Sequence, residues 1–268
     1  MLLWVFNLWA FIFGHRAWSK FNKFLYNLGL RGLGVLNYTD IRLSGESHFL
    51  SRLAPLLKNG VAFDVGANEG AYSSKLHTLY PSLTIFCFEP HPETYRRLAK
   101  RVTPLEIKPF NLGLGEKSGG ALLYDYSEFD GSSHASLYDG VIVKLHQKPA
   151  QSHQVDISTL DEFATKQKVE FIDLLKIDTE GNELSVLKGA ENLISQGRIK
   201  IIQFEFNEMN IFSGARFKDF WDLLSKKYFI FRLLPKGFLP ISRYNPLDCE
   251  VYAYQNFVAC IKGLTILN

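Results

Sequence analysis

Short apolar runs that each end at a polar residue alternate with amphipathic segments through most of the chain. Such runs are typical of strands buried on both faces of a parallel sheet, and the segments between them have apolar residues at helical spacing. The predicted strands are 61–63, 83–88, 105–110, 171–177 and 200–206, and the predicted helices are 44–57, 71–80, 92–102, 159–166, 183–195 and 217–227. Strand and helix in alternation predict an α/β fold with right-handed crossovers.

Three segments depart from this alternation. Residues 119–126 form a short strand-like piece, and residues 127–152 are polar without a clear period. A segment of that length without structure is usually functional or disordered, and we expect a lid over the active site. The last apolar runs, 228–234 and 250–261, are separated by three prolines and predict a closing pair of antiparallel strands.

The first 43 residues have a composition of their own. Residues 1–13 are almost wholly apolar but shorter than the ~20 residues of a membrane span, and they lack the basic start and cleavage site of a secretory signal. Residues 16–28 place Trp and Phe opposite Lys and Arg at helical spacing. Two interpretations stay open: peripheral membrane contact through residues 1–28, or a helical cap on the main domain or on a second subunit of a homo-oligomer. We therefore divide the chain into an extension, 1–43, and one domain, 44–268.

Composition and charge narrow the class of protein. The 268 residues are 47% hydrophobic and 21% charged, which is globular. Four of the 30 Lys and Arg residues lie in the first 39 positions, which hold no acid, so 26 basic residues face 27 acidic ones in the rest. A neutral body is not typical of a nucleic-acid-binding protein. Three cysteines without a C-x-x-C motif predict neither a disulfide framework nor a zinc site, and fit the reducing cytoplasm.

The segment 61–70, VAFDVGANEG, predicts a strand, a tight turn and a helix. Gly66 and Gly70 leave backbone amides open to a ligand at the carboxyl end of the strand. Asp64 and Glu69 would repel a pyrophosphate, whereas S-adenosylmethionine carries an ammonium and a sulfonium that suit nearby acids. An ordinary turn without a ligand is the alternative.

The next two strand ends also carry polar residues. Glu89 follows the second strand, where an acid can accept hydrogen bonds from both ribose hydroxyls of a nucleoside. Its alternative role is to cap the helix that follows Pro90. Asn111, with Leu112 and Gly113, ends the third strand, and we expect it at the adenine edge.

A second cluster of acids lies in KIDTEGNE, residues 176–183. Three carboxylates within six residues are costly to gather unless something cationic or protic is bound there. We expect Asp178 beside the sulfonium of the methyl donor, and Glu180 or Glu183 to take a proton from an acceptor hydroxyl. The alternative is that Glu180 and Glu183 only complement a helix N-terminus.

Further acceptor contacts are expected from Glu205 and Glu208, at the end of the fifth strand, and from His134 in the predicted lid. His134 is a candidate base or substrate contact, with an ordinary exposed loop histidine as the alternative. No histidine completes a set of metal ligands with these acids, so we assign no metal.

Together these motifs resemble the FkbM family of S-adenosylmethionine-dependent methyltransferases. The matching blocks are FDVGANEG at 63–70, FEPHPETYRRL at 88–98, NLGLG at 111–115, VDISTLDEF at 155–163, LLKIDTEGNELSVLKGA at 174–190 and IQFEFNE at 202–208. The resemblance implies a class I Rossmann-like methyltransferase, with a mostly parallel seven-stranded sheet and an antiparallel closing strand. The cofactor contacts then expected are Asp64, Gly66, Ala67, Asn68, Gly70, Glu89, Pro90, Asn111, Leu112, Gly113 and Asp178.

The resemblance also implies a reaction. The family is mostly linked to O-methylation of sugars, glycans and natural products, so we expect S-adenosylmethionine as cofactor and a small-molecule or glycan acceptor. Two alternatives stay open: another nucleotide-binding enzyme on the same sheet, and a membrane-associated module that keeps the fold without turnover. The expected place is the cytoplasm, with or without peripheral contact to a membrane.

Overall fold

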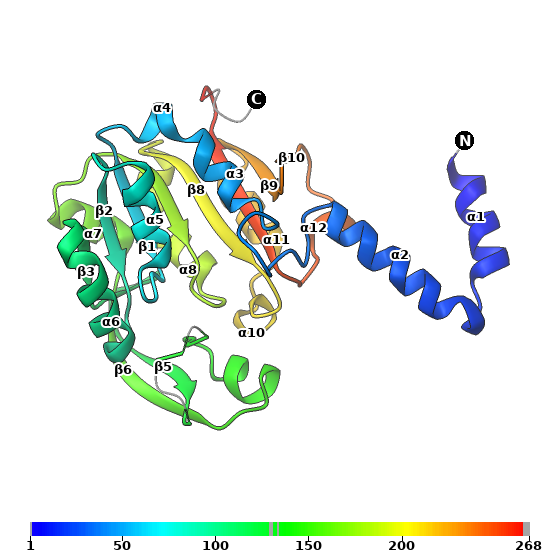
Figure 1. Ribbon diagram of the computed structural model, residues 1–268, viewed down its shortest axis with the longest axis horizontal. Helices are drawn as coiled ribbons and strands as arrows, with labels where there is room; N and C mark the ends of the chain where they lie inside the picture. The colour runs from blue at the N-terminus through cyan, green and yellow to red at the C-terminus, as the bar shows by residue number, and fades with distance from the viewer. Residues whose placement is uncertain (1, 129–130, 133, 265–268) are drawn as a thin grey trace.

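An α/β body carries two N-terminal helices that project away from it (Figure 1). In this computed structural model, which describes residues 2–128, 131–132 and 134–264, eight strands form one sheet in the order β10-β9-β11-β8-β7-β1-β2-β3. Its strands are β1 (Val61–Val65), β2 (Thr84–Phe88), β3 (Lys108–Phe110), β7 (Ile172–Ile177), β8 (Ile199–Phe206), β9 (Tyr228–Leu234), β10 (Gly237–Ile241) and β11 (Gln255–Ile261). From β3 to β8 the neighbours run parallel, and β11, β9 and β10 extend the sheet in antiparallel fashion.

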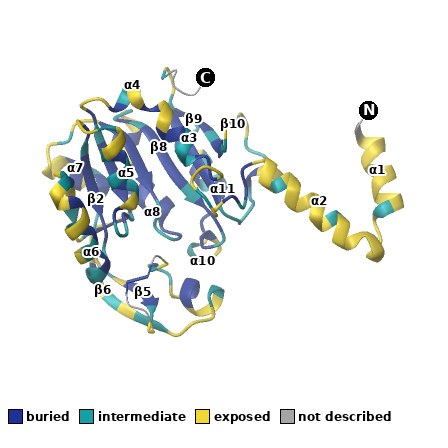
Figure 2. Cartoon of the chain, in the orientation of Figure 1, coloured by how far each residue is buried: buried dark blue, intermediate teal, exposed yellow. Residues whose placement is uncertain are grey.

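Helices cover both faces of this sheet (Figure 1). The two faces are covered mainly by α3 to α6 and by α7, α8, α9 and α11. The helices of the described residues are α1 (Leu2–Phe13), α2 (Ser19–Gly32), α3 (Glu46–Arg52), α4 (Ala54–Leu57), α5 (Ala71–Leu79), α6 (Pro92–Val102), α7 (Leu160–Lys166), α8 (Glu183–Lys188), α9 (Glu191–Ser195), α10 (Asn210–Ser213), α11 (Phe217–Leu224) and α12 (Pro246–Cys249). The strands between the helical layers are buried along almost their whole length (Figure 2), as the continuous apolar runs predict.

Alternation along the strands separates two hydrophobic clusters. In β1, Phe63 and Val65 face the layer of α7, α8, α9 and α11, while Ala62 faces α3 to α6. Phe163 of α7 packs edge-on against aromatic rings of three neighbouring strands, with its centroid 4.6 Å from that of Phe88 and 4.9 Å from that of Phe110. Edge-to-face contacts of this kind add to the energy of burial.

The α/β fold with an antiparallel end is confirmed, but the main sheet has eight strands instead of seven. The reason is a hairpin, in which β10 pairs with β9 beyond the two closing strands that the sequence predicts. Two predicted helices, 44–57 and 183–195, are each split in two. The second break lies at Gly189, where a Cβ atom would stand 2.0 Å from the carbonyl oxygen of Gly115, so the backbones approach too closely for a side chain.

A second, three-stranded sheet, β4-β6-β5, lies beyond β3. Its strands are β4 (Gly113–Leu114), β5 (Gly119–Tyr126) and β6 (Ala150–Ser158). The strand at 119–126 is therefore confirmed, and the loop expected over 127–152 is shorter than predicted, because its last residues start β6 and residues Val141–Leu145 form a π-helical turn. Residues 129–130 and 133 of that loop lie outside the described part.

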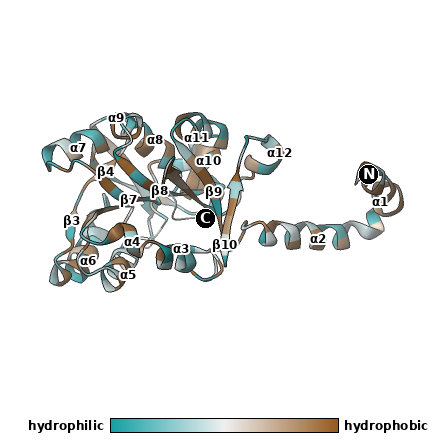
Figure 3. Cartoon of the chain, turned by 90° about the horizontal axis from the view of Figure 1, so that it is seen from above, coloured by the Kyte–Doolittle hydropathy of each residue, from teal (hydrophilic) through white to brown (hydrophobic). Residues whose placement is uncertain are grey.

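The N-terminal extension is attached to the body through residues 33–36. Val35 pairs with Gln255 of β11, the amide of Leu36 donates to the carbonyl of Tyr254 at 2.8 Å, and Arg232 donates to the carbonyl of Leu33 at 3.3 Å. Before this point α1 and α2 are exposed along almost their whole length (Figure 2), and α1 is apolar around most of its surface (Figure 3). Among the described helices, none combines the length and the apolar character needed to cross a bilayer.

The packing of Phe163 generates a prediction about stability. Replacing Phe163, which is 4% exposed, by Ala removes its contacts with the rings of three strands and is expected to lower the free energy of unfolding by about 3–5 kcal/mol. Urea denaturation of both proteins measures the difference. The matched control is Phe171→Ala at a ring that is 48% exposed, for which we expect a loss below about 1 kcal/mol. Equal losses in the two variants would contradict this account of the core.

Candidate functional site

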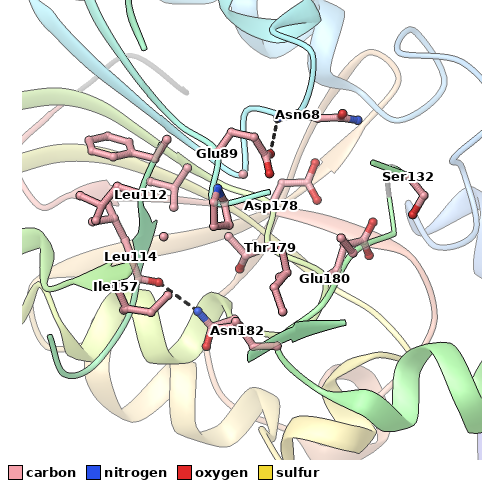
Figure 4. A pocket seen from close by; sticks show the side chains of 18 residues that line it. Asn68, Glu89, Leu112, Leu114, Ser132, Ile157, Asp178, Thr179, Glu180 and Asn182 are labelled. Carbon is pink, nitrogen blue, oxygen red and sulfur yellow. Dashed lines mark hydrogen bonds between the residues drawn. The ribbon is translucent and has the colours of Figure 1, made fainter. Parts of the chain in front are cut away.

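The order of the strands in the sheet reverses at β1. The chain first adds β2 and β3 on one side of β1 and then adds β7 and β8 on the other side. Ligands of open α/β sheets bind at such switch points, beside the carboxyl ends of the strands. A cavity of about 590 Å³, partly open to solvent, lies there between the main sheet and the small one (Figure 4). It is lined by Val65, Gly66, Asn68, Phe88, Glu89, Pro90, Leu112, Gly113, Leu114, Leu123, Ser132, Ala135, Leu137, Ile157, Asp178, Thr179, Glu180 and Asn182.

The turn after β1 is pressed against the turn after β7. Gly66 has φ +76°, and a Cβ atom there would stand 1.8 Å from the carbonyl oxygen of Asp178, so no side chain fits. Gly70 and Ala67, both predicted to contact the cofactor, are not among the residues that line the cavity. A Cβ atom on Gly70 would meet Leu98 and Val102 at 2.7 Å, so its role in the structure is the packing of α5 on α6.

Glu89 is the carboxylate at the end of β2, and it faces the cavity. It accepts hydrogen bonds from the backbone amides of Asn68 at 3.0 Å and His91 at 2.9 Å, one on each oxygen. Burial raises the pKa of Glu89 to about 7 despite these two donors. Each oxygen keeps a second lone pair, so the carboxylate can accept two further hydrogen bonds from vicinal hydroxyls.

Asn111 takes a different position from the one predicted. Its side-chain amide donates to the carbonyl oxygens of Glu89 and Pro90, both at 2.9 Å, so it holds the backbone after β2 in place and does not line the cavity. The two residues that follow it, Leu112 and Gly113, do line the cavity. At this place the cavity therefore has an apolar wall, and not the side-chain amide of Asn111 that was predicted to meet the adenine.

Asp64 does not line the cavity either. Because it alternates with Phe63 and Val65, its side chain points to the opposite face of the sheet, where it is fully buried and accepts a 2.6 Å hydrogen bond from Ser73. Glu69 is turned outward to Arg97, at 2.9 Å. The carboxylates that face the cavity and disfavour a pyrophosphate are therefore those of Glu89, Asp178 and Glu180, and not the two predicted ones.

Asp178 closes β7 and is held by a buried lysine. The Nζ atom of Lys176 lies 3.1 Å from Asp178 and 3.5 Å from Asp64. Burial alone would lower the pKa of Lys176, but Asp178, Asp64 and Glu46 outweigh this effect and raise it, so the ammonium stays charged. This ion pair fixes the position of the Asp178 side chain between the turn after β1 and the turn after β7.

Glu180, which lines the cavity, is brought together with His134, which does not. Glu180 has φ +53°, an uncommon conformation for a residue other than glycine, and its Oε1 atom lies 3.5 Å from Nδ1 of His134. Burial raises the pKa of Glu180 to about 7. The hydrogen bond with Glu180 in turn raises the pKa of His134. The two groups can share a proton near neutral pH, as an acid–base pair requires.

Glu183 is buried and holds the turn after β7 together by hydrogen bonds. It is 1% exposed, accepts hydrogen bonds from the amides of Thr179 at 2.8 Å and Gly181 at 3.2 Å, and contacts Asn210 at 3.3 Å. Those bonds hold the turn that presents Glu180. Of the two candidates for the proton acceptor, only Glu180 lines the cavity.

One wall of the cavity comes from Ser132, Ala135 and Leu137, in the segment predicted as a lid. Asp125 holds the start of this wall in place by accepting from the amides of Gly131 at 2.7 Å and Ser132 at 2.9 Å. Several lining residues of this wall, of the small sheet and of the turn after β7 were not predicted from the sequence: Leu114, Leu123, Ser132, Ala135, Leu137, Ile157, Thr179 and Asn182. The blocks NLGLG and VDISTLDEF, which contain Leu114 and Ile157, were the available signal.

The lining groups fit S-adenosylmethionine. Glu89 offers acceptors for a ribose diol, Leu112, Leu114 and Ile157 offer an apolar wall for a planar base, and the carboxyl group of Asp178 suits the positive charge of a sulfonium. For a metal ion the donors do not assemble, since the described residues contain no group of three or more His, Cys, Asp or Glu side chains placed to hold one.

Comparison with known proteins agrees with this geometry. Residues 64–231, more than half of the chain, match the methyltransferase FkbM domain. The 2-O-methyltransferase NoeI of Sinorhizobium fredii is 24% identical over 165 residues, 58% of this chain and 66% of that protein. The hexuronic acid methyltransferase AglP of Haloferax volcanii is 30% identical over 173 residues, 63% of each chain. The chain thus spans slightly less than two thirds of the length of these relatives.

Solved structures are more distant. A precorrin-6y C5,15-methyltransferase from Geobacter metallireducens superposes with a TM-score of 0.43 at 12% identity, covering 85% of this chain and 91% of that one. The domain match does not depend on that superposition and covers the chain from the end of β1 through β8 and into β9. The chain therefore belongs to the FkbM family of S-adenosylmethionine-dependent methyltransferases.

Proposed function

We propose that this protein transfers a methyl group from S-adenosylmethionine to a hydroxyl oxygen of a sugar, a glycan or another sugar-containing metabolite. The observation that carries the proposal is that Glu89, Asp178 and Glu180 line one cavity and that Glu180 contacts His134, which does not itself line it. Two of the relatives have names that state 2-O-methylation and methylation of a hexuronic acid. The three cysteines, all buried as free thiols, support a reducing compartment such as the cytoplasm.

Each group has a distinct role in this proposal. Glu89 accepts hydrogen bonds from the ribose hydroxyls of the cofactor, and Asp178 lies beside its positive charge. The cofactor supplies an electrophilic methyl group. Glu180 accepts the proton of the acceptor hydroxyl, and His134 orients Glu180 and shares that proton. Positioning and deprotonating the acceptor is most of what the protein must do for an in-line displacement.

The raised pKa of Glu89 predicts how cofactor affinity depends on pH. At pH 6 most of the Glu89 carboxyl is protonated, because its pKa in the folded protein is about 7, and at pH 8 most of it is ionised and can accept from both hydroxyls. The affinity for S-adenosylhomocysteine should therefore rise by about tenfold from pH 6 to pH 8. Calorimetric titration at the two pH values measures it.

Two controls accompany this titration. Glu89→Gln should bind more weakly and lose the pH dependence, whereas Glu180→Gln should keep it. NAD is the control ligand, because three carboxylates face the cavity that its pyrophosphate would enter. Binding of NAD in place of S-adenosylhomocysteine would overturn the proposed function in favour of another nucleotide-binding enzyme, and binding of neither would favour a non-catalytic module.

The role of Glu180 predicts a separation of binding from turnover. Glu180→Gln keeps the shape of the side chain but removes the proton acceptor, so methyl transfer should slow by about 10²–10⁴-fold while the Kd for S-adenosylhomocysteine changes by less than about threefold. Release of S-adenosylhomocysteine in the presence of a set of saccharides measures turnover. Glu183→Gln is not an equivalent control, because Glu183 holds the turn. Loss of cofactor binding in Glu180→Gln would show that the two roles are assigned wrongly.

A further inference from the structure

A second cavity adjoins the first on the other side of Asp178. It has a volume of about 770 Å³, partly open to solvent, and it lies among the segment before α3, the N-terminal part of α5 and the ends of β7 and β8. Its polar lining includes Glu46, Tyr72, Lys176, Asp178, Glu205 and Tyr254. Asp178 lines both cavities, so a group bound in either one lies next to the same carboxylate.

The floor of the second cavity is an ordered hydrogen-bond network. Gln203 of β8 is 1% exposed, donates to Glu46 at 2.8 Å and accepts from the hydroxyl of Tyr72 at 2.7 Å. Both the nitrogen and the oxygen of the Gln203 side-chain amide are therefore hydrogen-bonded, and these bonds fix Glu46 and Tyr72 at the cavity wall. A network with these partners is preorganised for a polar ligand, since a ligand need not order the side chains it contacts.

The charges in the second cavity are not balanced. Its lining contains three acids, Glu46, Asp178 and Glu205, and two cations, Lys75 and Lys176. Lys176 is also paired with the buried Asp64. Burial raises the pKa of Glu46 and that of Glu205, and for Glu205 the neighbouring Asp178 and Glu180 raise it further. These carboxyl groups therefore take up a proton more readily than exposed ones; a bound ammonium or hydroxyl donor would favour their ionised form, whereas an anionic ligand would disfavour it.

We propose that the second cavity holds the acceptor, and that the acceptor is a neutral or amine-bearing sugar ring instead of a hexuronate. The inference rests on the proposed function. It follows from the shared position of Asp178, because an in-line displacement needs the methyl donor and the attacking hydroxyl on opposite sides of the carbon that is transferred. Glu46 and Glu205 accept hydrogen bonds from the ring substituents, and the ring of Tyr254 offers an apolar face to the sugar. The reacting hydroxyl extends past Asp178, which both cavities share, toward Glu180 of the first cavity.

The test uses three probes on the full chain saturated with S-adenosylhomocysteine: the methyl glycosides of glucose, glucosamine and glucuronic acid. Saturation-transfer NMR titration should give binding of the first two and at least about tenfold weaker binding of the third. A bound ammonium would favour the ionised form of Glu205, and Glu205→Gln removes the carboxyl that can ionise, so the ratio between glucosamine and glucuronate should fall by at least about threefold. Glu191→Gln makes the same substitution at an exposed position on α9 and should leave the ratio unchanged.

Each outcome of this test has one meaning. Equal binding of glucuronate and glucose, no binding of any probe, or an unchanged ratio in Glu205→Gln would overturn the acceptor proposal. The affinity of every variant for S-adenosylhomocysteine is measured first. Failure of that step in the unmodified protein would count against the proposed function itself, whereas failure of the saccharide step alone counts only against the second cavity.

The projecting helices carry an independent inference. Ring contacts join α1 to α2 at their corner, where the centroids of Phe13 and Trp18 lie 4.9 Å apart, and Trp9 donates to Asn22 at 3.2 Å. Beyond this corner large apolar side chains stay exposed, among them Phe6 at 62% and Phe11 at 90%. An apolar surface of this kind on a projecting element marks an interaction site.

The charge of these helices indicates their partner. The first 39 residues contain Arg16, Lys20, Lys23 and Arg31 and no acid, although the body of the chain is neutral. We propose that α1 and α2 bind the surface of an anionic lipid membrane, with the aromatic side chains in the interface and the cations at the headgroups. A membrane-linked glycan would then reach an enzyme held at the same surface.

Vesicle co-sedimentation of the full chain tests the membrane proposal. Vesicles of phosphatidylcholine with phosphatidylglycerol should sediment at least about fivefold more protein than vesicles of phosphatidylcholine alone, and 0.5 M salt should reduce this excess. Phe6→Ser with Phe11→Ser should weaken binding to both kinds of vesicle, and Lys20→Gln with Lys23→Gln only to the anionic ones. The matched control, Lys226→Gln with Lys227→Gln, changes the same charge on the exposed surface of the body and should bind as the unmodified chain does.

Two results would overturn the membrane proposal. One is equal sedimentation of the unmodified chain and the Phe6→Ser, Phe11→Ser variant with anionic vesicles. The other is a concentration-dependent rise in molar mass without lipid that this variant abolishes, since the exposed side chains would then bind a second copy of the chain.

Discussion

A buried ion pair at the centre of the sheet determines how the two cavities are arranged. Lys176 is 7% exposed and lies between Asp64, which belongs to β1, and Asp178, which follows β7. An ammonium is costly to bury unless it is paired, so the lysine and the two carboxylates keep one another in place. Asp178 is thereby held where the turns after β1 and β7 touch, at the boundary between the first cavity and the second. Removal of the lysine would leave both carboxylates without this counter-ion, whereas removal of one carboxylate would leave the lysine paired with the other.

Around this ion pair the protein gathers more negative charge than it neutralises. Glu89 is buried and Glu180 is half-buried, and loss of water around them raises the pKa of each to about 7. Burial destabilises the ionised form of such a carboxyl group, and contact with a hydroxyl, an ammonium or a sulfonium stabilises it again. Perturbation of this kind at a cavity is typical of a site that binds protic and cationic ligands, and S-adenosylmethionine together with a hydroxyl acceptor supplies both.

The rest of the site comes from segments that lie far from these strands in sequence. The small sheet supplies Leu123 and Ile157, and the loop between its strands supplies Ser132 and the His134 that contacts Glu180. Asp125 bonds the start of that wall, so its position depends on the pairing of β5 with β6. At the opposite end of the main sheet, residues 33–36 attach the N-terminal helices to β9 and β11 while leaving α1 and α2 exposed.

By itself the sequence determined the parallel sheet, the family and the strand-end acids Glu89 and Asp178, because apolar periodicity and the residue that ends an apolar run are local properties. Only the tertiary structure decided which polar residues face a cavity. Asp64, Gly70, Asn111 and Glu183 belong to the same motifs as the lining residues, yet the pleat of β1 and the bonds of the turns direct them elsewhere. The small sheet, the partner of Glu180 and the second cavity depend on contacts between segments up to 157 residues apart, such as that of Glu46 with Gln203. Such contacts form only when the whole sheet is assembled, and no local pattern encodes them.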